Sequence, residues 1–198
     1  MKLKNYKEFI NESKNNDSMN VFDMDDTLCI TGAKIRIYDP SNHTEYALTP
    51  QEFNDYERKP HHIVDFGEFD NHEILMNGKI IKWVVDILVN TMKKGKDVGI
   101  ITARGDKQII IDFFKKHGIH LNPAFIFAVN SPNSKYTGNV HQRKQQAFED
   151  LIAIGYTNFR FFDDNQSNLD YAKKLEEIYP NISMETKLIL PKHIPAFK

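Results

Sequence analysis

Short apolar segments alternate with amphipathic helical segments along most of this chain, and this alternation limits the possible folds more than any other feature. The expected strands are residues 19–23, 98–101, 125–129 and 159–162. The expected helices are residues 78–94, 106–117, 142–154 and a last one that carries Leu169, Ala172, Leu175 and Ile178 before a short apolar run at 188–190. Helices between consecutive strands are typical of a parallel sheet that is covered on both faces. The sequence therefore predicts an α/β fold, with three α/β/α layers around a parallel central sheet.

An insert at residues 29–77 interrupts this alternation. Polar and apolar residues alternate at 34–38, and a second extended run at 44–48 follows a turn, which predicts a β-hairpin. Residues 49–52 (Thr-Pro-Gln-Glu) have the N-cap, the first-turn proline and the capping-box glutamate of a helix start. We therefore expect a small hairpin-plus-helix insert directly after the first strand, either as a cap over a site or as a structural decoration.

Polar side chains follow three of the predicted strands at the point where each strand ends. These residues are Asp23, Asp25, Thr102, Arg104, Asp163, Asp164 and Asn165. The carboxyl ends of parallel strands meet at one edge of the sheet, where ligands bind in open α/β folds. Buried carboxylates are costly unless a cation or a reacting group accompanies them. The sequence therefore predicts a chemically active site at this edge.

Composition restricts the class of protein further. The 198 residues are 40% hydrophobic and 27% charged, which is sufficient for one globular domain with a substantial core. The formal net charge of −1 gives no overall basic field for nucleic acid or a membrane surface. No apolar run approaches the roughly 20 residues of a membrane span, and no secretory signal is visible. We therefore expect no membrane partner and a cytoplasmic location.

The cysteine and histidine pattern predicts neither a disulfide nor a zinc site. Cys29 is the single cysteine, which excludes an intramolecular disulfide, and we expect it to be a small buried packing residue. His61 and His62 form the only histidine cluster, and no cysteine or histidine follows at a spacing that completes a zinc site. We interpret this histidine pair as part of a surface loop.

The polar strand ends resemble the motifs of the haloacid dehalogenase (HAD) superfamily of aspartate-nucleophile phosphotransferases. Residues 21–28 (Val-Phe-Asp-Met-Asp-Asp-Thr-Leu) are similar to its first motif, residues 100–104 (Ile-Ile-Thr-Ala-Arg) to its second and residues 161–165 (Phe-Phe-Asp-Asp-Asn) to its fourth. The third motif is only a lysine at a helix start, which is Lys144 by position, with Lys135 as the alternative. The resemblance implies a Rossmann-like domain with a small cap insert, and the activity of a HAD-type phosphatase (a phosphoric monoester hydrolase).

The resemblance also implies a role for each of four catalytic residues. Asp23 attacks phosphorus and forms an aspartyl-phosphate, and Asp25 protonates the leaving alcohol and later activates water. Thr102 hydrogen-bonds the transferring phosphoryl group, and Lys144 bridges the phosphate and the nucleophile. Because Asp25 supplies the acid that a phosphate ester needs, its presence favours a phosphatase over a dehalogenase.

A magnesium ion and its contacts follow from the same resemblance. The predicted Mg²⁺ ligands are Asp23, the backbone carbonyl of Asp25, Asp164 and Asp163, of which Asp163 alternatively orients the lysine. The predicted substrate contacts are Arg104, Thr27 and Lys135. A guanidinium forks onto phosphate oxygens, although a salt bridge from Arg104 to an acidic neighbour is equally compatible with the sequence.

The intermediate size of the insert is compatible with several phosphorylated substrates. Nucleotides and the terminal 3′-phosphates of nucleic acids are favoured, and a sugar or other small-metabolite phosphatase is the enzymatic alternative. A receiver-like signalling domain and a packaged phage protein that keeps the HAD fold without activity are the non-enzymatic alternatives. The late position of Asp163 and Asp164 argues against the first, and the intact set of carboxylates argues against the second.

Residues 1–18 are predicted to form an amino-terminal extension before the phosphatase domain at 19–198. Residues 1–12 resemble the targeting peptides of internal head proteins in large tailed bacteriophages, and Ile10-Asn11-Glu12 is similar to the site at which a prohead protease cleaves. This resemblance implies assembly into a phage head after synthesis in the host cytoplasm. An amphipathic helix that packs on the domain is the alternative.

Overall fold

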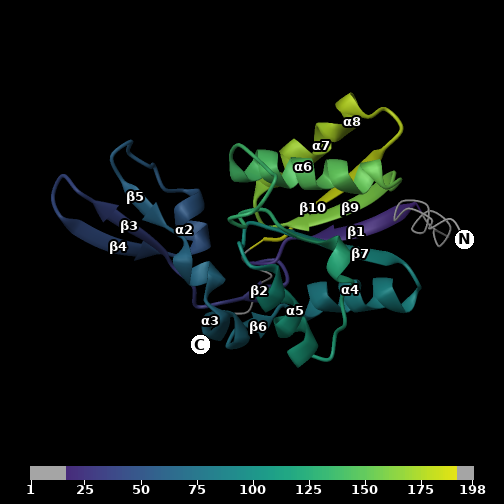
Figure 1. Cartoon of the computed structure of the whole chain (residues 1–198), viewed down its shortest axis with the longest axis horizontal. Coiled ribbons are helices and arrows are strands. Elements are labelled where there is room, and N and C mark those ends of the chain that lie inside the picture. Colours follow the sequence, from purple (N-terminus) through teal and green to yellow (C-terminus); the bar gives the residue numbers. More distant parts are fainter. Residues whose placement is uncertain (1–16, 191–198) are drawn as a thin grey trace, which may run out of the picture.

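The computed structural model describes residues 17–190, and its centre is a five-stranded sheet in which all strands are parallel (Figure 1). The strands are β1 (Ser18–Phe22), β7 (Asp97–Thr102), β8 (Ile126–Ala128), β9 (Asn158–Asp163) and β10 (Ser183–Leu188), in the spatial order β10-β9-β1-β7-β8. All of their carboxyl ends therefore lie at the same edge of the sheet. The predicted α/β fold with a parallel central sheet is confirmed.

Helices cover both faces of this sheet. They are α4 (Lys82–Lys93), α5 (Lys107–Lys116), α6 (Val140–Ala153), α7 (Gln166–Lys173) and α8 (Leu175–Ile178). Successive side chains of a strand point to opposite faces. Phe22 and Phe162 accordingly join one core with α4 and α5, while their neighbours Val21 and Phe161 join a second core with α6 and α7. Figure 1 shows these two pairs of helices on opposite sides of the sheet.

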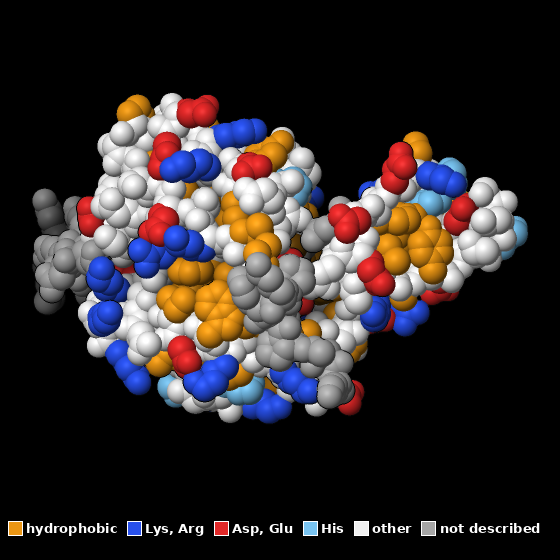
Figure 2. Space-filling model, turned by 180° about the vertical axis from the view of Figure 1, so that it is seen from behind, with side chains coloured by type: hydrophobic (Ala, Val, Ile, Leu, Met, Phe, Trp, Pro, Cys, Tyr) orange, Lys and Arg blue, Asp and Glu red, His pale blue; other side chains and the backbone are white. Residues whose placement is uncertain are grey.

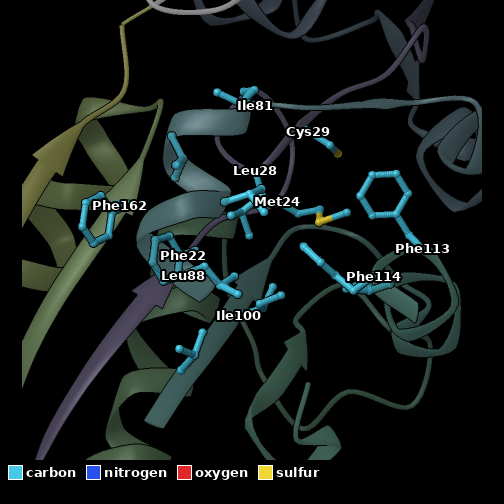
Figure 3. Packing of buried hydrophobic residues seen from close by; sticks show 14 of the residues in the cluster. Phe22, Met24, Leu28, Cys29, Ile81, Leu88, Ile100, Phe113, Phe114 and Phe162 are labelled. Atoms are coloured by element: carbon cyan, nitrogen blue, oxygen red, sulfur yellow. The ribbon is translucent and has the colours of Figure 1, made fainter. Parts of the chain in front are cut away.

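The core beside α4 and α5 is dominated by large apolar side chains (Figure 3). The rings of Phe22 and Phe162 stack with centroids 4.7 Å apart and planes 8° apart. Phe113 and Phe114 of α5 meet edge to face at 5.4 Å. Burying one such side chain stabilises a protein by roughly 1.5–3 kcal/mol. This packing fixes β1 and β9 immediately before the polar residues at their ends.

One predicted helix begins later than expected, and the last strand lies mostly before the apolar run at 188–190, for which no strand was predicted. α4 begins at Lys82, later than predicted, because Lys79–Ile80 form strand β6 and pair antiparallel with β2 (Cys29–Ile30). The last strand, β10, covers Ser183–Leu188 rather than the apolar run at 188–190. β10 lies at the edge of the sheet and most of its residues are exposed, so its sequence is largely polar.

The insert contains the predicted hairpin and helix together with a further strand. β3 (Ile35–Asp39) and β4 (Thr44–Leu48) pair antiparallel, and α2 (Pro50–Asn54) begins with the expected capping box at Thr49. β5 (Ile63–Asp65) pairs with the other edge of β3, so the insert has its own three-stranded sheet. β5 was not predicted, because it has only three residues and two of them are exposed.

The insert returns to the main body through η1, a 3-10 turn at Gly67–Asp70, and α3 (His72–Met76). Figure 1 shows its sheet projecting to one side of the body, ahead of the carboxyl ends of the central strands. Seen from behind, a notch separates the insert from the body (Figure 2). Ile63 and Phe66 of the insert are exposed apolar residues. The insert is therefore placed to form one wall of a site at the sheet edge.

The structure also bears on predictions for single residues. Cys29 is fully buried, as predicted. His61 is exposed, but His62 is only 4% exposed, so the interpretation of this pair as a surface loop is wrong for His62. The ring of His62 stacks on Tyr56 with centroids 5.8 Å apart, a packing that its sequence neighbours do not reveal.

Residues 1–12, whose sequence resembles a targeting peptide, lie outside the described residues. The same holds for the predicted cleavage site at Ile10-Asn11-Glu12. Across residues 17–190, none of the helices has the length and apolar character that crossing a membrane requires.

Candidate active site

A cavity of about 740 Å³ lies between the carboxyl edge of the central sheet and the insert. The polar wall at the sheet edge includes Asp23, Asp25, Thr102, Arg104, Lys144 and Asp164. The wall that the insert forms has five apolar residues, Ile35, Pro50, Phe53, Phe66 and Phe69, together with Asp65, Gly67 and Asp70. A concave site with an apolar wall and a few convergent polar groups is typical of small-molecule binding.

Lys144 connects two of the strand-end carboxylates. It lies in the first half of α6, where Asn139 caps the helix, and its side chain is almost completely buried. Its Nζ donates to Asp23 Oδ1 at 2.7 Å and to Asp163 Oδ2 at 2.8 Å. Lys135 instead pairs with Asp150 at 2.5 Å, is largely exposed and does not line the cavity. Of the two alternatives, the structure brings Lys144 to the predicted site.

Asp163 and Asp164 are adjacent but have different surroundings. Asp163 is fully buried and accepts hydrogen bonds from the Asn168 amide at 2.9 and 3.0 Å and from the Asn165 backbone N–H at 2.8 Å, besides that from Lys144. Asp164 lines the cavity. Asp163 is therefore placed to orient the lysine, and Asp164 to contact a bound ion.

Among residues 17–190, a single ammonium lies beside three carboxylates at this edge. Oxygens of Asp23, Asp163 and Asp164 lie within 4.8 Å of one another, and Lys144 is the ammonium between them. Burial, only partly offset by Lys144, raises the pKa of Asp23 to about 7. Burial and the Asp163 carboxylate also raise the pKa of Asp164 well above its usual range.

The lysine responds in the opposite way. Burial lowers the pKa of Lys144, but Asp163 and Asp23 more than offset this, so its pKa lies above the usual value and the ammonium is retained. Three carboxylates around one ammonium favour the binding of a further cation. The ligand atoms of this cluster are carboxylate oxygens, which fit a hard divalent ion such as Mg²⁺.

Asp25 is held by a buried arginine. The Nε and Nη2 of Arg104 donate to the two oxygens of Asp25 at 2.9 and 2.6 Å, which is the bidentate geometry of a guanidinium–carboxylate pair. The Nη1 of Arg104 donates to the backbone carbonyl of Phe69 in the insert. Arg104 is 1% exposed and lines the cavity. The structure thus shows the salt-bridge alternative for Arg104.

The two predicted threonines lie in different places. Thr102 ends β7 and lines the cavity, and its Oγ1 accepts from the backbone N–H of Arg104 at 3.2 Å. Thr27 is fully buried, and its Oγ1 has no hydrogen-bond partner among the described residues. Thr27 does not line the cavity, so the structure does not place it where the predicted substrate contact requires.

Several residues of the site were not predicted. Asn168 holds Asp163, and its Oδ1 in turn contacts His141 Nδ1 at 2.6 Å. Asn168 follows Asp163 by five residues, in the first turns of α7, so its position on that helix was a usable signal. Phe53 and Phe66 had no such signal, because their approach to the sheet edge depends on how the insert folds back.

A tight turn after Asp25 directs the chain into the insert. Asp26 adopts a left-handed conformation (φ 55°), and its backbone N–H donates to the carbonyl of Cys29 at 2.8 Å. Gln51 of α2 donates to Asp26 Oδ2 at 2.6 Å. Burial and the charge of Asp25 raise the pKa of Asp26 to about 7. This turn links α2 of the insert to the acidic end of β1.

Comparison of the chain with protein-family models, with curated proteins and with solved structures finds no match.

Proposed function

We propose that this protein is a Mg²⁺-dependent phosphomonoester hydrolase with a Rossmann-like, HAD-type fold that acts through an aspartyl-phosphate intermediate. The observation that carries the proposal is the pair of hydrogen bonds from Lys144 to Asp23 and Asp163 at the wall of a cavity. A buried ammonium beside a carboxylate nucleophile can neutralise an incoming phosphate dianion. The resemblance of the three strand ends to HAD motifs supports the same assignment.

Asp23 is the nucleophile of the proposed reaction. Its carboxylate oxygen forms a bond to phosphorus while the bond from phosphorus to the substrate oxygen breaks, and Asp25 gives a proton to the leaving alcohol. Water then attacks the phosphorus and transfers a proton to Asp25. The bond between Asp23 and phosphorus breaks, which releases inorganic phosphate and restores both carboxyl groups.

The remaining residues bind and orient the reacting groups. Lys144 hydrogen-bonds the phosphoryl oxygens and Asp23, and Thr102 donates its hydroxyl to the phosphoryl group. Asp23, Asp164 and the Asp25 carbonyl would hold Mg²⁺, which supplies positive charge that neutralises the phosphate. Each Asp25 oxygen accepts one N–H of Arg104, so the arginine orients this acid–base group, and in this proposal Asp25 gives up one of these hydrogen bonds while it carries the proton.

The insert favours a nucleotide or a nucleic-acid 3′-end over a sugar phosphate. Three aromatic side chains, Phe53, Phe66 and Phe69, line the cavity opposite the acidic edge. Aromatic faces bind bases by stacking, and this contribution is about 1–3 kcal/mol per base. In this proposal the insert acts as a cap that binds the nucleoside while the sheet edge carries out the chemistry.

The decisive experiment is a hydrolysis assay with an aryl phosphate, with and without Mg²⁺, on the wild type and Asp23→Asn. We expect Mg²⁺-dependent release of phosphate and a loss of more than about 10³-fold in kcat in the variant, because the covalent route is removed. Asp86→Asn, at an exposed position of α4, is the matched control and should retain full activity. Unchanged turnover in Asp23→Asn would falsify the assignment of the nucleophile.

A substrate panel then separates the enzymatic alternatives. It should contain mononucleotides, oligonucleotides phosphorylated at the 3′- or 5′-end, and sugar phosphates. We expect higher kcat/KM for the base-containing substrates. Beryllofluoride bound at Asp23 without turnover of any phosphoester would instead support a receiver-like or catalytically silent protein.

A further inference from the structure

The insert brings together three potential metal ligands that lie outside the cavity. Asp39 is the last residue of β3. His61 and His62 directly precede β5, which pairs with β3 in the same sheet. The Nε2 of His61 lies 3.3 Å from Asp39 Oδ1, and the Nε2 of His62 lies 3.4 Å from Asp39 Oδ2. One ligand atom from each residue falls within 4.8 Å of the others. None of the three lines the cavity at the sheet edge.

His62 is the feature of this cluster that packing alone leaves unexplained. Its side chain is more than nine-tenths buried, and its Nε2 has no hydrogen-bond partner within the described part of the chain, although it faces Asp39. Leaving a buried polar atom unsatisfied costs about 1–3 kcal/mol. A ligand that accepts the lone pair of Nε2 would remove this cost.

The other nitrogen of His62 already has the partner that a metal-bound histidine needs. Its Nδ1 is hydrogen-bonded to the hydroxyl of Tyr56, and the hydroxyl of Tyr56 is hydrogen-bonded to that of Tyr46. Metal-ligating histidines commonly donate their second ring N–H to an oxygen, which fixes the tautomer. With Nδ1 as the donor to Tyr56, Nε2 is deprotonated and free to bind an ion.

Asp39 is held as a carboxylate in a fixed orientation. The backbone N–H and the hydroxyl of Ser41 donate to its Oδ1 at 2.9 and 2.6 Å. Its Oδ2 faces His62 and keeps lone pairs for a ligand bond.

We propose that Asp39, His61 and His62 bind a divalent transition-metal ion of the Zn²⁺ type. Two imidazoles and one carboxylate suit Zn²⁺ or Co²⁺, whereas Mg²⁺ prefers oxygen ligands only. His61 is exposed, so a fourth coordination position is open to solvent. The ion would join the end of β3 to the segment before β5, and it would stabilise the insert independently of the site at the sheet edge.

The test is a Co²⁺ titration of the untagged full chain after treatment with a chelator, in the presence of excess Mg²⁺ to occupy oxygen-only sites. We expect one equivalent to bind, with visible absorption bands typical of four or five ligands, and a higher melting temperature. Competition with Zn²⁺ should bleach these bands.

Single substitutions locate the ion. His61→Ala removes an exposed ligand with little effect on packing, so we expect the affinity for Co²⁺ to fall by more than the about 10–100-fold that loss of an outer-shell partner costs. Asp39→Asn should act in the same direction. His72→Ala, at an exposed histidine of α3, is the matched control and should leave affinity unchanged.

Two results would overturn the proposal. One is the absence of Co²⁺ binding to the wild type at millimolar concentration. The other is binding that survives in His61→Ala but is lost in Asp164→Asn, which would place the ion at the acidic sheet edge. Neither result bears on the proposed phosphatase, since hydrolysis by His61→Ala is measured with Mg²⁺ alone and should equal that of the wild type.

Discussion

Two clusters of polar side chains, one at the sheet edge and one in the insert, stabilise buried carboxylates in different ways. At the sheet edge, Lys144 lies among three carboxylates and is buried with them. In the insert, Asp39 is held by the neutral Ser41 and faces two imidazoles. The first site has an internal cation, whereas the second has none among the described residues and only its His61 is exposed.

This difference predicts which properties a substitution in each cluster changes. Buried charges depend on one another, so removing one leaves the rest uncompensated in a low-dielectric interior. In the insert, Asp39 keeps its hydrogen bonds from Ser41 when a histidine is replaced, and an exposed group such as His61 is screened by water and contributes less to stability. We therefore expect substitutions at the sheet edge to affect folding and chemistry together, and substitutions in the insert to affect binding with a smaller change in stability.

The largest effect is expected for Lys144→Met. The substitution keeps the length of the side chain but leaves Asp23 and Asp163 buried without their ammonium. Removing one partner of a buried ion pair costs about 3–5 kcal/mol, which denaturant unfolding of the metal-free protein would measure. Lys135→Met breaks an exposed pair with Asp150 and is the matched control, for which about 0–1 kcal/mol is expected. Equal losses in the two variants would contradict the comparison.

The next effect is expected for Arg104→Lys. A lysine cannot reproduce the two parallel hydrogen bonds to Asp25 or the additional one to the Phe69 carbonyl. A misplaced catalytic group typically costs about 10²-fold in rate, so we expect a fall of this size in kcat for an aryl phosphate. Arg160→Lys, in an exposed pair with Glu185, should leave kcat unchanged. A wild-type kcat in Arg104→Lys would show that the two hydrogen bonds from Arg104 do not position Asp25.

The sheet edge could be predicted from the sequence because local pattern and topology agree there. Asp23, Thr102 and Asp163 each follow a short apolar strand, and parallel strands bring such ends together whatever the details of packing. Lys144 could be predicted from its position near the start of a helix. The partner of Arg104 could not be chosen, since the directions of two side chains from different strands are not encoded in strand order.

The insert was predictable only where its signals are local. The hairpin and the cap at Thr49 depend on neighbouring residues and were predicted. His62 is buried because the rings of Tyr46 and Tyr56 pack against it. No periodic sequence pattern links these three positions, so their contact could not be predicted. β5 gains its strand geometry from pairing with β3 rather than from its own composition.

The two sites should also show opposite dependence of stability on pH. The pKa of Asp23 is raised from 3.8 to about 7 by burial, so between these values the folded protein binds more protons than the unfolded chain. Its contribution to stability is therefore present below pH 3.8 and is lost as the pH rises toward 7. The slope for one group is at most about 1.4 kcal/mol per pH unit.

Asp39 has the reverse sign, because hydrogen bonds from Ser41 lower its pKa from 3.8 to about 2. Its contribution is present above pH 3.8 and is lost as the pH falls toward 2. Denaturant unfolding at several pH values, in chelator, should show a smaller fall toward pH 7 in Asp23→Asn, where Asp26 and Asp164 still contribute to the fall, and a smaller loss in acid in Asp39→Asn. Identical pH profiles for the two variants would contradict the assignment of opposite signs.

The smallest effect is expected for Phe66→Ala, which tests the insert as a recognition surface. Phe66 is 45% exposed and meets Phe53 edge to face at 5.4 Å, so its ring can contact a base without supporting the core. The lost contact of about 1–3 kcal/mol should raise KM for a nucleotide by roughly tenfold or more with little change in kcat. For a sugar phosphate, both constants should stay near wild type, because that substrate has no aromatic ring to stack on Phe66. Ile63→Ala, at an exposed position of β5 away from the cavity, is the matched control. A fall in kcat with both substrates would instead show that the insert takes part in the chemistry at the sheet edge. The proposal that the insert only binds the base would then be wrong.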